Sequence, residues 1–176
     1  QRVGALGKVY DPYIKATTPY RSAFDQVDRM SNVLAAANEN PALLSAADQL
    51  SLLTTWAKIE RPTEAIQEGD INNAKNLASR WGIAASWIDD VIGGRGQRID
   101  DGLVNDILRN IQAKMPDLYK KYQGDYEHHA GRFSRAGFDP TKEMMPMRDR
   151  PSSASWQPGS ASWSPPKPEG KLKRID

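Results

Sequence analysis

The chain has 176 residues, of which 39% are hydrophobic and 26% charged, and its formal net charge is +2. This length fits one domain, and the apolar share lies well above that of a wholly disordered chain. The absence of cysteine excludes disulfides and thiolate metal sites, and no stretch approaches the roughly 20 apolar residues of a membrane span.

The first 18 residues carry aromatic and aliphatic side chains that follow no helical period. Tyr10 and Tyr13 flank the Asp11-Pro12 step in this region. We therefore expect residues 1–18 to form an extended arm that lies on the core or on a neighbouring chain. The two tyrosines are its predicted partner-binding residues.

Two successive segments begin with the pattern that is typical of a helix start. A polar cap residue is followed by proline at positions 18–19 and again at 40–41. Apolar residues then recur at three- and four-residue steps, which predicts helices over about 19–38 and 41–59. The short joint between them predicts an antiparallel helical hairpin.

Three further helices are predicted over residues 70–81, 84–92 and about 100–133. Aspartates cap the first and the last, and glycines end the first two: Asp70, Asp100 or Asp101, Gly82, and Gly93-Gly94. Pro116 lies inside the last helix, where it removes one backbone hydrogen bond. We expect a kink near Ala113 or two helices placed end to end.

The composition changes near residue 141. The following residues are rich in Pro and Ser, and the tetrapeptide Ser-Ala-Ser-Trp occurs at 153–156 and again at 160–163. Tryptophan is enriched among binding hot spots, and proline-rich segments lose little entropy on docking. Trp156 and Trp163 have no predicted packing role within their own chain and are therefore predicted partner-binding residues, together with the basic end of the chain at Lys171, Lys173 and Arg174. The other three tryptophans, Trp56, Trp81 and Trp87, lie on helical stripes and are predicted to be core residues.

The predicted fold class is all-α, with an arm at 1–18, a helical domain at 19–140 and an irregular docking tail at 141–176. From residue 141 onward the chain has seven Lys or Arg and four Asp or Glu, so the tail carries a net charge of +3 and the rest of the chain −1. A nearly neutral folded part argues against a dedicated nucleic-acid surface. The alternative is a nucleic-acid-associated protein that uses the basic tail and the arginines at positions 95 and 98.

No residue pattern predicts catalysis, a cofactor or a metal. His128 and His129 are adjacent on a helix, so they point about 100° apart and do not form a ligand pair. The glycine-containing stretch 89–98 lacks the Lys-Ser/Thr ending of a P-loop and is interpreted as a helix stop. The aspartate doublets in and after it are interpreted as caps. The chain is therefore predicted not to be an enzyme.

Three stretches together resemble a helical module of tailed-bacteriophage virion proteins, among them DNA-ejection and tail-associated proteins. They are Trp56 to Ile71 (WAKIERPTEAIQEGDI), Gly94 to Ile99 (GRGQRI) and Gly137 to Pro140 (GFDP). Glu68-Gly69-Asp70 matches an E-G-E step of that module, and the last stretch matches its closing G-x-D-P. Arg61-Pro62 stands where the module has Asp-Pro, and Gln67 stands in place of an arginine.

The resemblance covers about residues 24–140 and implies a virion protein that helps the genome leave the particle. The leading hypothesis is a homo-oligomer whose partners are other virion proteins (portal, tail or ejection proteins). Weak contact with genomic DNA is expected from the basic tail. The implied location is the virion, with delivery to the host cell envelope on infection. The resemblance names no catalytic residue.

Overall fold

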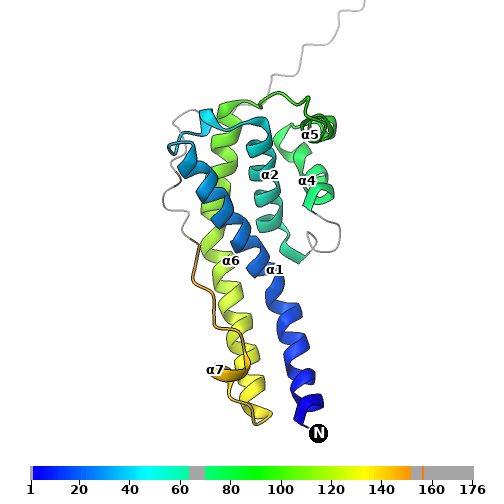
Figure 1. Ribbon diagram of the computed structural model, residues 1–176, viewed down its shortest axis with the longest axis vertical. Helices are drawn as coiled ribbons and strands as arrows, with labels where there is room; N and C mark the ends of the chain where they lie inside the picture. Colours follow the sequence, from blue (N-terminus) through cyan, green and yellow to red (C-terminus); the bar gives the residue numbers. More distant parts are fainter. Residues whose placement is uncertain (1, 64–69, 152–155, 157–176) are drawn as a thin grey trace, which may run out of the picture.

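The structure is a computed structural model that describes residues 2–63, 70–151 and 156 of the chain, and within them every regular element is a helix (Figure 1). The predicted all-α class is confirmed. Three long helices, α1 (Arg2–Ala36), α2 (Ala46–Glu60) and α6 (Asp101–Arg135), form the body. The shorter α4 (Asp70–Ala78) and α5 (Ala85–Ile92) pack on the side of α2.

Helix α1 includes the residues predicted to form an extended arm, so that prediction is wrong. The helix continues through Pro12 and Pro19, although each proline removes one backbone hydrogen bond. Val9, Tyr13 and Thr17 are buried at four-residue steps and form one stripe with the buried residues farther along the helix. Burial of this stripe outweighs the local proline signal, because most helix stability in proteins comes from packing.

The hairpin prediction is confirmed, but α2 begins later than expected. Asn40 and Pro41 start only a short 3-10 turn, η1 (Pro41–Leu43). The α-helix begins after Ser45, whose hydroxyl accepts from the Asp48 N–H (3.1 Å) while the Asp48 carboxylate accepts from the Ser45 N–H (3.0 Å). Such a reciprocal capping box satisfies two helix-end donors at once.

The glycine stops are confirmed. A single turn, η2 (Ser79–Trp81), follows α4, and Gly82 then ends it with a left-handed φ of 69°. Gly93 caps α5, and Gly94 adopts φ 74°. The structure describes the backbone of Asp70 and not its side chain, so the predicted cap lies outside the described part of the chain.

Helix α6 is one continuous element that runs through Pro116, so the predicted alternative of two helices end to end is wrong. Its N-cap is Asp100, whose carboxylate accepts from the Leu103 N–H (3.1 Å). Pro116 itself is exposed. The buried stripe of α6 therefore stays continuous on both sides of the proline.

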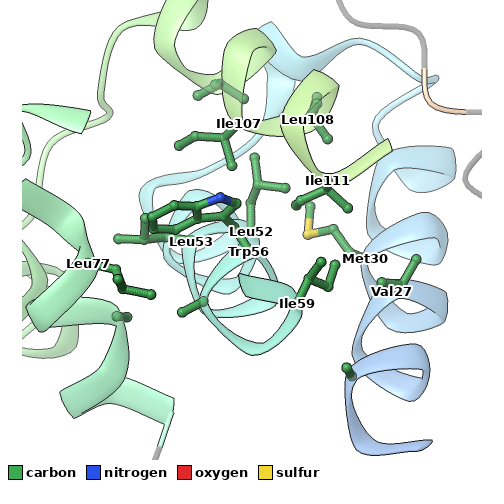
Figure 2. Packing of buried hydrophobic residues seen from close by; sticks show 14 of the residues in the cluster. Val27, Met30, Leu52, Leu53, Trp56, Ile59, Leu77, Ile107, Leu108 and Ile111 are labelled. Carbon is green, nitrogen blue, oxygen red and sulfur yellow. The ribbon is translucent and has the colours of Figure 1, made fainter. Parts of the chain in front are cut away.

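The main core surrounds α2, which contacts α1, α4, α5 and α6. Figure 2 shows Trp56 at its centre, between leucines of α2, Leu77 of α4 and the isoleucines of α6. The indole N–H of Trp56 donates to the Asn110 side-chain oxygen (2.9 Å), so its one polar atom is satisfied. The prediction that Trp56 is a core residue is confirmed.

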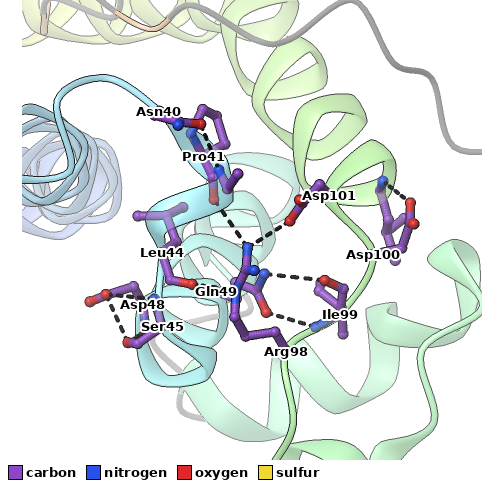
Figure 3. A network of polar contacts seen from close by, with 12 residues as sticks. Asn40, Pro41, Leu44, Ser45, Asp48, Gln49, Arg98, Ile99, Asp100 and Asp101 are labelled. Carbon is purple, nitrogen blue, oxygen red and sulfur yellow. Dashed lines mark hydrogen bonds and ion pairs between the residues drawn. The ribbon is translucent and has the colours of Figure 1, made fainter.

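A polar latch joins the start of α2 to the loop before α6 (Figure 3). The buried Gln49 amide accepts from the Ile99 N–H (2.8 Å) and donates to the Ile99 carbonyl (3.3 Å). The Arg98 guanidinium donates to the Leu44 carbonyl (2.6 Å) and to Asp101 (2.6 Å). These bonds fix the position at which α6 starts.

A second, smaller cluster closes the far end of the α1–α6 pair, below the main core in Figure 1. Its buried members come from both helices and from the segment after them: Val9, Tyr13, Phe133, Phe138 and Met144. A short helix α7 (Pro140–Glu143), capped by Asp139, turns the chain back at this point. The chain beyond α7 then returns along α1 and α6, as the orange segment of Figure 1 shows.

Candidate docking surface

The returning segment, residues 144–151, is here called the strap. It is irregular, as predicted for this part of the chain, but it packs on its own helices. Tyr13 donates its hydroxyl to the Met145 carbonyl (3.0 Å), and Arg21 donates to the Pro146 carbonyl (2.5 Å). The start of the predicted docking tail is therefore part of the folded body.

Arg148 holds the middle of the strap. Its guanidinium pairs with Asp25 (2.8 Å) and Asp28 (2.5 Å) on α1 and lies 5.7 Å from the Phe24 ring centroid. Its backbone N–H donates to the Tyr122 hydroxyl (2.9 Å). Arg148 thus connects the strap to α1 and to α6.

Trp156 lies in a slot between α1 and α6, and only 2% of its surface is exposed. Its indole N–H donates to the Ser31 hydroxyl (2.7 Å), and its carbonyl accepts from the Gln112 side-chain amide (2.7 Å). We call this site the Trp156 slot. The prediction that Trp156 has no packing role within its own chain is wrong, because its partners are distant in sequence and leave no local signal.

The tyrosines predicted to bind a partner also face inward. Tyr13 is fully buried, and Tyr10 is partly buried with its ring centroid 6.0 Å from that of Tyr13. Burial is the main cause that raises the pKa of Tyr13, partly offset by the neighbouring Arg21. Tyr13 is therefore unavailable to a partner in this arrangement, which corrects the prediction for it.

The remaining predicted docking residues, Trp163, Lys171, Lys173 and Arg174, lie outside the described residues. Of the seven predicted partner-binding residues, the structure assigns Tyr13 and Trp156 to the interior and Tyr10 to its edge. The docking prediction is thereby narrowed to the chain after Trp156.

A groove of about 350 Å³ with largely apolar walls lies between η2, α5 and the start of α6. It is lined chiefly by Trp81, Ile83, Trp87, Ile99 and Leu103. Trp81 and Trp87 were predicted to be core residues, and both are only partly buried, with Trp87 donating to the Gln97 carbonyl (2.7 Å). The two glycine stops on either side of α5 are the sequence signal that could have indicated a short, incompletely covered helix.

The histidines occupy different environments. His128 is exposed, whereas His129 is buried near Tyr13, with ring centroids 6.0 Å apart. Burial lowers the pKa of His129, and the positive charge of Arg132 lowers it further. Among residues 2–63, 70–151 and 156, no three carboxylate or imidazole side chains gather at a position that would hold a metal ion.

The glycine-containing loop is the predicted helix stop. Its Arg98 is engaged by backbone carbonyls and Asp101, and the side chain of Arg95 lies 3.6 Å from Asp90. Arg98 thus has a structural role, which weakens the alternative that this loop binds phosphate.

Comparison of the chain with family models, with curated proteins and with solved structures found no match. Within the part of the chain that the structure describes, no helix is both long and apolar enough to cross a membrane.

Proposed function

We propose that this chain is a non-enzymatic virion protein of a tailed bacteriophage, a DNA-ejection or portal- or tail-associated component that docks onto other virion proteins. Its helical body acts as a rigid carrier, and the chain after Trp156 is the docking element. We propose further that it assembles in several copies in the particle. The proposed location is the virion, with release toward the host envelope.

The observation that supports this proposal most is the use of the duplicated tryptophan repeat. Trp156 of the first copy is part of the folded body, because it is buried and both its indole N–H and its carbonyl form hydrogen bonds. The second copy, ending at Trp163, and the basic residues after it lie outside the described residues. Because Trp156 fills the slot, a second tryptophan in the same chain is a suitable anchor for a partner.

The positions that carry the family resemblance also lie where they organise the body. Gly94 to Ile99 form the loop fixed by the Gln49 latch, and Gly137 adopts φ 81° where α6 gives way to α7. The resemblance therefore supports a shared helical body and leaves the docking role to the tail.

The test is the copy number of this chain in purified particles, measured by mass spectrometry relative to the major capsid protein. The comparison uses phages that encode the wild-type chain, Trp163→Ala, or Val3→Ala, an exposed apolar control near the start of the chain. Truncating a hot-spot tryptophan costs about 2 kcal/mol or more, so we expect at least a roughly ten-fold loss for Trp163→Ala. Equal incorporation of all three chains would contradict the docking role of the tail.

A further inference from the structure

The Trp156 slot contains two directional contacts besides the buried ring. Ser31 on α1 accepts the indole N–H at 2.7 Å, and Gln112 on α6 donates to the carbonyl of the same residue at 2.7 Å. The slot thus binds a tryptophan through its indole N–H and through the backbone carbonyl of the same residue.

The chain contains a second segment with the same features. Ser153-Ala154-Ser155-Trp156 is followed by Gln-Pro, and Ser160-Ala161-Ser162-Trp163 is followed by Ser-Pro. Five of the six positions in these two hexapeptides are therefore identical. The indole N–H and the backbone carbonyl that Ser31 and Gln112 bond in Trp156 are groups that Trp163 also has.

We propose that the Trp156 slot is a binding site for the hexapeptide Ser-Ala-Ser-Trp-x-Pro, and that Trp163 of the same chain fills it when Trp156 does not. The occupant is thus the second repeat of this polypeptide. The inference concerns the folded body alone, so it holds or fails independently of any virion partner.

The length of the connecting chain sets the balance between the two occupants. Trp156 follows the buried Pro151 by five residues, and Trp163 follows it by twelve. Loop-closure probability falls as about the three-halves power of length, which favours Trp156 by about four-fold. Trp163 therefore occupies the slot in roughly one-fifth of the molecules.

The test is a double-mutant cycle on the full chain, read as the folding equilibrium constant from urea unfolding. Trp163→Ala alone leaves the constant nearly unchanged, and Trp156→Ala lowers it only about five-fold, because the second repeat takes over the slot. The double variant lowers it at least about 100-fold, as expected for an emptied tryptophan site. If Trp156→Ala alone is as damaging as the double variant, or does not fold while Trp163 is present, the proposal is overturned.

A second measurement does not depend on the double variant folding. The chain is labelled with 5-fluorotryptophan, and the signals of the two repeat tryptophans are assigned with Trp156→Phe and Trp163→Phe. In the Trp156→Ala protein, the fluorine signal of Trp163 should move to the position that Trp156 has in the wild type. A Trp163 signal unchanged from that of the wild type would contradict occupancy of the slot.

Discussion

At the scale of single residues, side chains far apart in the sequence hold this fold together. Arg148 joins the strap to α1 and α6, and Trp156 is bonded to the same two helices. His129 is a buried ionisable group, with the cation of Arg132 near it and Asp125 as its one opposing charge. Each of these residues can be tested separately.

Replacing Arg148 with Met keeps most of the apolar stem and removes the guanidinium. The acids that it pairs with are about half exposed, so the ion pairs are screened, and we expect a loss of about 1–2 kcal/mol of unfolding free energy. Chemical denaturation measures this loss, and Arg150→Met, at an exposed strap position, is the matched control. A loss no larger than that of the control would show that the pairing contributes little.

The lowered pKa of His129 makes the stability of the protein depend on pH. Below the unfolded-state pKa of about 6.5 the unfolded chain binds a proton that the folded chain does not, so stability falls as the pH drops. We expect His129→Gln to reduce this loss between pH 7 and pH 5 and His128→Gln to retain most of it. Urea unfolding at both pH values measures the difference, and a wild-type protein equally stable at the two would refute the assignment.

At the scale of elements, local sequence signals located most helices, and packing decided the rest. Caps and glycines gave α4, α5 and the start of α6 within a few residues, because these signals act on neighbouring backbone groups. They failed for residues 2–18, where two prolines suggested a break that burial of Val9 and Tyr13 overrides. They also failed for Trp156, whose partners are remote in the sequence.

Replacing glycine with alanine is expected to have opposite effects at Gly96, which precedes the polar latch, and at Gly124 in α6. A Cβ at Gly96 would lie 2.1 Å from a Val91 methyl and 2.7 Å from its backbone, so Gly96→Ala must displace the loop before α6. We expect it to destabilise the protein by about 1–3 kcal/mol, measured by thermal unfolding.

The control is Gly124→Ala in the middle of α6, where the new Cβ meets nothing within 4 Å. There the substitution should stabilise the protein by about 0.5–1 kcal/mol, because alanine loses less backbone entropy in a helix. Equal melting temperatures for the two variants would show that the loop tolerates a side chain at position 96.

At the scale of the whole molecule, the helical class and the hairpin could be predicted from periodicity, whereas the division between body and tail could not. The compositional change near residue 141 suggested that the body ends there, yet Met144, at the start of the strap, and Trp156 belong to the two core clusters. Composition indicates whether a segment can fold alone. The strap adopts its position because hydroxyl groups and a guanidinium on α1 and α6 form hydrogen bonds with it, and the slot between these helices holds Trp156. The inward positions of Tyr13 and Trp156 could not be predicted for the same reason, because the groups that they pack against are remote in the sequence.

The most direct test of the account is to compare two truncations of the chain by urea unfolding. A chain that ends after Pro158 keeps the strap and Trp156, and we predict an unfolding free energy within about 0.5 kcal/mol of the full chain. A chain that ends after Glu143 lacks both, and the emptied tryptophan slot alone predicts a loss of about 3 kcal/mol or more. If the two truncated chains are equally stable, the strap is not part of the folded body and the account is wrong.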